Sequence, residues 1–153
     1  MKKITAILFV LILCLSLGAC KFIKTDASDA TEDNCYYVYI GMETPVKYTV
    51  DLTKVEVTEG AFSVLSYLKE TEGITFTYQV GAYGAYITAV GDLTAEGSSY
   101  IALYTTYDED KDLPGPYTTE KVVDGKTFVT AGVGASSMHV VGGQSIYLTL
   151  ETY

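Results

Sequence analysis

The chain has 153 residues, of which 48% are hydrophobic, and it carries a formal net charge of −9. This length and composition favour a single folded domain with its own hydrophobic core, and they differ from those of disordered chains. Every basic residue is a lysine, and without arginine the chain lacks the bidentate phosphate contacts that nucleic-acid binding favours, so we expect no nucleic-acid partner.

The N-terminus has the pattern of a bacterial export signal. Two lysines precede an apolar run over residues 4–17, which is shorter than the roughly 20 residues that cross a bilayer. The ending Leu17-Gly18-Ala19-Cys20 resembles a lipobox, in which the cysteine receives a diacylglycerol and becomes the first mature residue. We therefore predict a signal peptide over residues 1–19 and a lipid on Cys20 that anchors the protein to the outer face of the bacterial cell membrane, in an extracytoplasmic location. An ordinary secretory signal and an uncleaved anchor are the alternatives.

A tether and a single domain follow. Residues 20–34 contain the lipidated cysteine and a segment rich in Asp, Ser, Thr and Ala, which predicts a flexible linker with a reach of roughly 20 Å. The remaining 153 − 34 = 119 residues, 35–153, have the size of one domain. Cys35 is the single thiol left after the signal and the lipid, so we interpret it as a small apolar residue, with an intermolecular disulfide as the alternative.

Strand patterns dominate the first half of this domain. Residues 35–40 and 45–52 flank a turn and predict a hairpin, and residues 54–57 continue the alternation. Apolar residues then recur at helical spacing from Ala61 to Leu68, with Gly73 as the C-terminal cap, which predicts one short helix. Residues 74–80 alternate as a strand with Ile, Phe, Tyr and Val on one face.

The second half predicts further strands. Residues 83–90 and 99–107 are joined through the turn Gly91-Asp92, and residues 120–123 and 126–130 bracket Asp124-Gly125, a strong hairpin signal. Residues 138–141 predict a brief strand, and residues 144–153 a final one with Ile146, Leu148 and Leu150 facing the core and Tyr147 facing out. One helix on a mostly antiparallel sheet is an α+β fold.

Tyrosines supply the candidate ligand-binding surface. Tyr83, Tyr86, Tyr100 and Tyr104 lie on two successive strand candidates, and their rigid amphipathic rings suit a small molecule, a glycan or a protein. Tyr107 falls on the opposite face of its strand. The competing interpretation is that these rings simply pack across the sheet, since tyrosine is a good strand residue.

The sequence offers weak metal candidates and no convincing catalytic group. Asp108, Asp110 and Asp112 alternate like the first half of a calcium loop, but the turn glycine and the bidentate carboxylate of that loop are missing. His139 is the single histidine, and nothing near it or Cys35 indicates a nucleophile with its base. We expect no enzyme activity and no required cofactor, with calcium as a weak candidate ligand.

A family resemblance covers residues 50–153. The successive segments VEVTEGAFSVLSYLKE, YGAYITAVGDLTAEG, YIALYTTY and DGKTFVTAGVGASSMHVVGGQSIYLTL resemble a family of exported bacterial domains related to the C-terminal domain of transcobalamin and intrinsic factor. The resemblance implies a β-grasp-like fold, a mostly antiparallel sheet crossed by one short helix, and ligand binding without catalysis. Because the eukaryotic relatives cover one face of cobalamin, it also makes a corrinoid a candidate ligand.

Two functions of different class follow from these observations. The first is a membrane-anchored lipoprotein that acts as a non-catalytic ligand-binding or interaction module, as a monomer or a weak dimer. The alternative is a structural or adhesive surface lipoprotein with no small-molecule ligand, which associates through Cys35 or a sheet edge.

Overall fold

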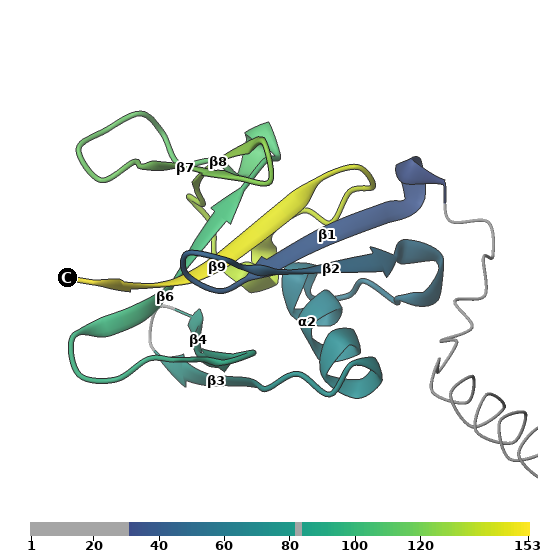
Figure 1. Ribbon diagram of the computed structural model, residues 1–153, viewed down its shortest axis with the longest axis horizontal. Helices are drawn as coiled ribbons and strands as arrows, with labels where there is room; N and C mark the ends of the chain where they lie inside the picture. The colour runs from purple at the N-terminus through teal and green to yellow at the C-terminus, as the bar shows by residue number, and fades with distance from the viewer. Residues whose placement is uncertain (1–30, 82–83) are drawn as a thin grey trace, which may run out of the picture.

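The computed structural model describes residues 31–81 and 84–153, so the predicted signal peptide, Cys20 and Tyr83 lie outside the described residues. The described residues form two sheets and one α-helix (Figure 1). The elements, in chain order, are β1 (Cys35–Ile40), β2 (Val46–Asp51), α2 (Gly60–Thr71), β3 (Phe76–Gly81), β4 (Gly84–Val90), β5 (Leu93–Thr94), β6 (Ser99–Thr105), β7 (Glu120–Val123), β8 (Lys126–Thr130) and β9 (Ser145–Thr152).

The larger sheet has six strands in the order β2-β1-β9-β6-β8-β7, and the smaller one has three in the order β3-β4-β5. Neighbouring strands are antiparallel except β1 and β9, which run parallel from the pair Tyr37 and Ser145 to the pair Ile40 and Leu148. The prediction of an α+β fold with mostly antiparallel strands is therefore confirmed. The division into two sheets was not predicted.

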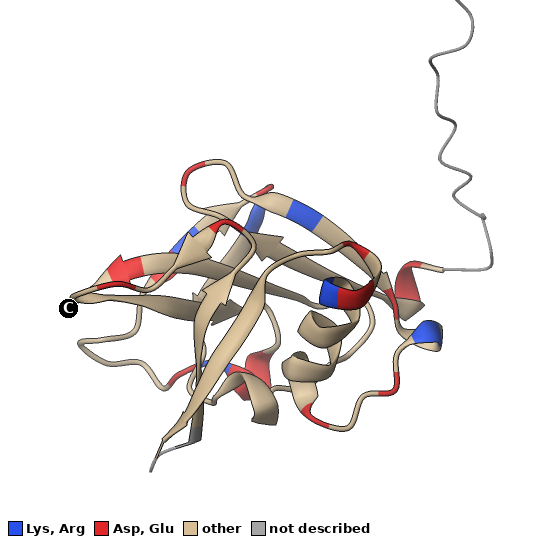
Figure 2. Cartoon of the chain, turned by 90° about the horizontal axis from the view of Figure 1, so that it is seen from below, with Lys and Arg blue, Asp and Glu red and all other residues tan. Residues whose placement is uncertain are grey.

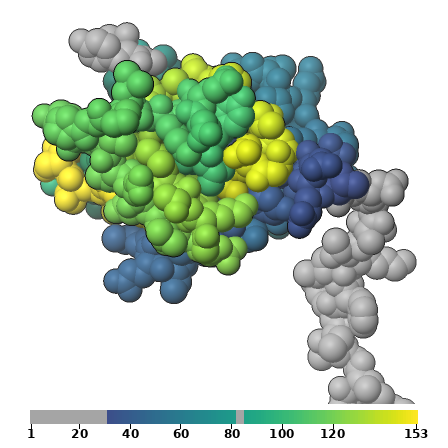
Figure 3. Space-filling model, turned by 90° about the horizontal axis from the view of Figure 1, so that it is seen from above, coloured from purple at the N-terminus to yellow at the C-terminus, as the bar shows by residue number. Residues whose placement is uncertain are grey.

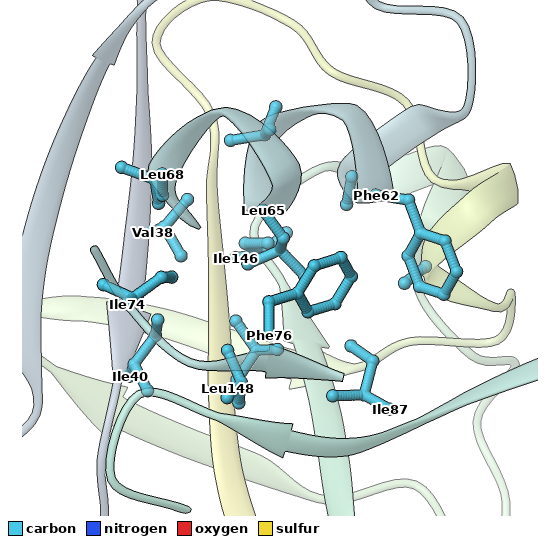
Figure 4. Close-up of a cluster of buried hydrophobic side chains, with 14 of the residues drawn as sticks. Val38, Ile40, Phe62, Leu65, Leu68, Ile74, Phe76, Ile87, Ile146 and Leu148 are labelled. Atoms are coloured by element: carbon cyan, nitrogen blue, oxygen red, sulfur yellow. The ribbon is translucent and has the colours of Figure 1, made fainter. Parts of the chain in front are cut away.

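The main core lies between the larger sheet, α2 and the smaller sheet. With twelve residues, α2 is too short to be stable alone and depends on its buried stripe. Figure 4 shows Phe62 and Leu65 of this stripe close to side chains of the two sheets. Each large apolar side chain buried here contributes about 1.5–3 kcal/mol to folding. The labelled residues are Val38, Ile40, Phe62, Leu65, Leu68, Ile74, Phe76, Ile87, Ile146 and Leu148.

The second face of the larger sheet is also covered, because the β7–β8 hairpin curls over it (Figure 1). β8 pairs with β6 only at Tyr104 and Thr105, and Phe128 then packs edge-on against the rings of Tyr39 and Tyr147. Residues drawn in green, from β6 to β8, occupy much of this side in Figure 3. The prediction that Tyr147 faces out is therefore wrong, since its side chain is buried beneath the hairpin.

Glycines lie at both ends of α2. Gly60 is required at the start, and Gly73 follows the end of the helix, as the sequence predicts. Gly60 has φ +51°, and a Cβ there would lie 2.6 Å from the carbonyl oxygen of Met138. Gly73 has φ +69° with open space around it, as expected of a glycine that terminates a helix. The helix therefore begins tightly against the loop that precedes β9.

Three local predictions differ from the structure. Tyr78 and Val80 were expected on the buried face with Phe76 but are exposed, although the ring of Tyr78 lies 5.7 Å from that of Phe76 on the same side of β3. The partner strand β4 carries a β-bulge at Thr88, which shifts the pairing of the two strands. Residues 138–141 form no strand, because they follow a 3₁₀ turn and lie against the N-terminus of α2. A 3₁₀ turn, Leu52–Lys54, ends β2 where the sequence predicted a continued strand.

The β3–β4 hairpin has no charged residue between positions 74 and 90, and Figure 2 shows it as a tan extension of the body.

Cys35 is buried, so its thiol is not positioned for an intermolecular disulfide. Within residues 31–81 and 84–153, no helix has the length and apolar character needed to cross a bilayer.

Candidate functional site

The candidate site is centred on Tyr104 of β6 and Glu151 of β9. The two strands pair in antiparallel register, which places Tyr100, Tyr104 and Glu151 on the same face of the sheet. The Tyr104 hydroxyl donates a 2.6 Å hydrogen bond to Oε1 of Glu151 and lies 2.9 Å from Oγ1 of Thr119. Because the Tyr104 proton is directed at the carboxylate, the Thr119 hydroxyl is the donor in the second bond.

Lys121 balances the charge of Glu151. Its Nζ lies 2.9 Å from Oε1 of Glu151 and 5.7 Å from the centroid of the Tyr104 ring. The Lys121 side chain is 43% exposed and that of Glu151 is 25% exposed, so the pair lies at the edge of the covered face. The centre of the site therefore holds two opposite charges and no net charge.

The pKa values keep these groups in their hydrogen-bonding states at neutral pH. Burial raises the pKa of Glu151, but the hydrogen bonds from Tyr104 and Lys121 outweigh it and the net pKa is lowered. Burial and the hydrogen bond to Glu151 raise the pKa of Tyr104. The hydrogen bond to Glu151 raises the pKa of Lys121. Glu151 and Lys121 thus stay ionised, and the tyrosine hydroxyls remain donors.

Aromatic rings form the rim. Tyr100 is 41% exposed, and its ring stacks on that of Tyr153 with the centroids 5.9 Å apart and the planes at 26°. The Tyr100 hydroxyl reaches Oε2 of Glu151 only at 3.5 Å, a weak contact that leaves this hydroxyl free to bind another group. Tyr117, on the loop before β7, is 86% exposed at the opposite rim.

Tyr100, Tyr104, Tyr117, Thr119 and Glu151 help to line a hollow of about 420 Å³, which is within the range of ligand pockets. A second hollow of about 320 Å³ lies beside it, and Glu151 lines both. We call the two together the β6–β9 groove. The first part is lined by Tyr100, Ile101, Ala102, Leu103, Tyr104, Pro116, Tyr117, Thr119, Thr130, Ala131, Val133 and Glu151. The second is lined by Met42, Glu43, Lys121, Val122, Val123, Tyr147, Thr149, Leu150 and Glu151.

The structure brings together two of the four predicted tyrosines. Tyr100 and Tyr104 share the groove, although the Tyr104 ring is buried against Tyr147 and only its hydroxyl serves the site. Tyr86 lies on β4 in the other sheet, half-exposed, with its ring across Gly81 of the neighbouring strand. Tyr83 lies outside the described residues. Tyr86 thus lies on a different sheet from Tyr100 and Tyr104, and a ligand-binding role for the four tyrosines stays a prediction.

The three predicted calcium-loop carboxylates have separate partners. Asp108 pairs with Lys111, and Asp112 accepts from the backbone N–H of Leu113. Asp110 is buried and accepts from the backbone N–H of His139 at 2.7 Å, with Nδ1 of His139 2.6 Å from its other oxygen. Among the described residues, no three His, Cys, Asp or Glu side chains lie close enough to hold a metal ion.

Asp110 and His139 join two loops beside the main core. The hydrogen bond to Asp110, together with the charge of that carboxylate, raises the pKa of His139. The ring of Tyr107 lies 5.2 Å from the imidazole, so Tyr107 packs here and not in the groove. This arrangement anchors the loop that supports the N-terminus of α2.

Sequence reasoning missed Glu151, Lys121, Thr119 and Tyr153. From the sequence, Glu151 is simply part of the predicted final strand and Lys121 part of a predicted hairpin strand. The usable signal was the tyrosine at alternate positions of β6, Tyr100 and Tyr104, whose hydroxyls need polar partners when the rings are covered. Nothing in the sequence indicated which partners these were.

Comparisons with known proteins give structural likenesses only. No protein-family model matches the sequence, and no curated protein matches it. A crystal structure of a protein from Ruminococcus gnavus ATCC 29149 that is proposed to bind metal is 18% identical with a TM-score of 0.48, covering 78% of this chain and 98% of that chain. Haptocorrin in complex with Cbi is 18% identical with a TM-score of 0.49, and the match covers 78% of this chain and 25% of haptocorrin.

Proposed function

We propose that this protein is a non-catalytic ligand-binding module that uses the β6–β9 groove. The observation that carries the proposal is Glu151, which lines a hollow of ligand size together with the exposed rings of Tyr100 and Tyr117 and pairs with Lys121 of the adjoining hollow. Convergent polar groups beside exposed aromatic rings are typical of binding sites.

The proposal includes an extracytoplasmic lipoprotein held to the outer face of the cell membrane through Cys20, as the export signal and lipobox indicate. A single helix crossing one face of the larger sheet supports a β-grasp-like fold of the transcobalamin C-terminal type. A corrinoid remains a candidate ligand through that resemblance alone. The buried Cys35 thiol and the engagement of His139 by Asp110 support binding over catalysis.

The β3–β4 hairpin favours a second function, that of an adhesive or structural surface lipoprotein. Tyr78, Val80 and Tyr86 are exposed on this uncharged hairpin, and apolar side chains gathered on an exposed element are typical of protein contacts. In that case the hairpin, and not the groove, would be the contact surface.

Nuclear magnetic resonance separates the two functions. The ¹⁵N-labelled full-length chain is titrated with the soluble small-molecule and oligosaccharide fraction of the cell envelope. We expect the amide resonances of Tyr100, Tyr117 and Glu151 to shift, while that of Tyr86 stays in place. Shifts confined to β3 and β4, or no shifts at all, would contradict the groove as a binding site.

A further inference from the structure

From the chemistry of the β6–β9 groove we infer that its ligand is an uncharged, polyhydroxylated chain, a neutral oligosaccharide. This inference rests on the proposed function, because it names the ligand class of the same groove. Three properties of the groove carry it: its charge balance, its hydroxyl groups and its length.

Around Glu151 the charge balance disfavours ionic ligands, and Glu43, the further carboxylate that lines the second hollow, can accept a hydrogen bond from a hydroxyl group of an uncharged ligand. Glu151 and Lys121 lie 2.9 Å apart and already neutralise each other. A cationic ligand drawn to Glu151 would meet the Lys121 ammonium, and an anionic ligand drawn to Lys121 would meet the carboxylate. An uncharged ligand can accept from Lys121 and donate to Glu151 without separating the pair.

The hydroxyl groups favour a ligand that presents neighbouring donors and acceptors. Among the described residues, the hydrogen-bond contact of Oε2 of Glu151 is the 3.5 Å one with Tyr100, so this oxygen can accept a stronger bond, and the Tyr100 hydroxyl can both donate and accept. Thr119 also lies beside Tyr104, and its hydrogen bonds with Thr130 hold its hydroxyl within hydrogen-bonding distance of the Tyr104 hydroxyl. Neighbouring hydroxyl groups on a sugar ring can donate to Glu151 and both donate to and accept from Tyr100.

The aromatic rim and the length of the groove favour a chain of rings. The Tyr100 ring lines the first hollow and is 41% exposed, so it offers an aromatic surface against which the C–H face of a sugar ring can lie, and its stacking on Tyr153 holds it in place. The two hollows continue past Glu151 on both sides, so a single small molecule would leave one of them empty. Two or more linked sugar rings would occupy both.

The test measures binding of defined probes to the full-length chain by isothermal titration calorimetry and by ¹⁵N spectra. The neutral probes are maltotriose, cellotriose and chitotriose. Spermine, citrate and pentaalanine represent cationic, anionic and peptide ligands. We expect at least one neutral trisaccharide to bind and to shift Tyr100 and Glu151, while the other three probes leave these resonances unchanged.

Variants locate the site. Tyr100→Ala removes the exposed aromatic ring of the first hollow and should weaken trisaccharide binding about tenfold, as expected of a central aromatic contact. Glu151→Gln keeps the shape, removes the acceptor charge and should also weaken it. Tyr86→Ala, a half-exposed tyrosine of the other sheet, is the matched control and should leave the affinity unchanged.

The outcomes distinguish the groove as a binding site from the oligosaccharide as its ligand. If spermine, citrate or pentaalanine shifts the groove and no sugar does, the oligosaccharide inference is overturned while the groove remains a binding site. If a sugar binds equally well to the Tyr100→Ala variant, the inference is overturned as well. If neither the probes nor the envelope fraction shifts any groove resonance, both the inference and the proposed function fail.

Discussion

The hydroxyl of Tyr104 and the carboxylate of Glu151, 47 residues apart in the chain, form a 2.6 Å hydrogen bond on the second face of the larger sheet. The bond connects the buried ring of Tyr104 with the partly exposed carboxylate of Glu151. It explains why Tyr104 supports folding and site geometry together, whereas Tyr86 lies half-exposed on the other sheet.

Replacing Tyr104 should test this double role through stability. Tyr104→Phe keeps the ring and removes a hydrogen bond to an ionised group, so we expect a loss of about 1.5–3 kcal/mol in the free energy of unfolding. Tyr104→Ser also leaves a cavity beside Tyr147 and should cost about 3–5 kcal/mol. Urea denaturation measures both.

The control for that series is Tyr86→Ser, which removes a half-exposed ring and should change stability far less than Tyr104→Ser. Equal losses at positions 86 and 104 would show that the two tyrosines have similar packing roles, contrary to the structure.

The two ends of α2 offer a matched pair of glycine substitutions. Both Gly60 and Gly73 have positive φ, but only Gly60 faces backbone oxygens, those of Ala135, Ser136 and Met138. Gly73→Ala should cost about 1 kcal/mol for the backbone conformation alone. Gly60→Ala adds the steric conflict and should cost about 3 kcal/mol or more. Thermal unfolding of the two variants gives the comparison, and similar melting temperatures would refute the close contact.

The pair formed by His139 and Asp110 predicts a pH-dependent contribution to stability. The folded-state pKa of His139 is raised, so its stabilising effect is complete below the unfolded value of about 6.5 and is lost as the pH rises through the folded value. His139→Asn removes this titration and keeps a side-chain donor. The melting temperature of the wild type should exceed that of the variant most at about pH 5.5 and least at about pH 8.5. A constant difference over that range would argue against the ion pair.

Lipid anchoring is tested at Cys20, which the proposal makes the attachment site. In cells fed a radiolabelled fatty acid, the full-length protein should carry the label and sediment with membranes. Cys20→Ser should lose the label, whereas Cys35→Ser should keep it, because Cys35 is a buried residue of β1. A labelled Cys20→Ser protein would place the lipid elsewhere.

Local patterns predicted the parts of the fold that short-range chemistry decides. The hairpin of β1 and β2, the helix ending at Gly73 and the Asp124-Gly125 turn were predicted because periodicity and positive-φ residues are local signals. The bulge at Thr88 of β4 was not predicted, since alternation alone carries no sign of an inserted residue.

The groove depends on long-range pairing, which a single sequence does not encode visibly. β9 pairs parallel with β1 and antiparallel with β6, and the β7–β8 hairpin curls over its outer face. That curl buries Tyr147 and brings Lys121 to Glu151. The sequence correctly predicts that Tyr100 and Tyr104 lie on the face of β6 opposite Ile101. It does not predict that the β7–β8 hairpin covers Tyr104, and therefore not that Tyr104 is buried while Tyr100 is exposed.

The most direct test of the central claim is photo-crosslinking in intact cells. The photoreactive residue p-benzoylphenylalanine replaces Tyr117, at the exposed rim of the groove, or Tyr86, on the uncharged hairpin, in the otherwise unchanged chain. If the groove is the binding site, irradiation should give a covalent adduct from position 117 and little or none from position 86. An adduct that forms from position 86 and not from position 117 would contradict the account and favour the hairpin as the contact surface.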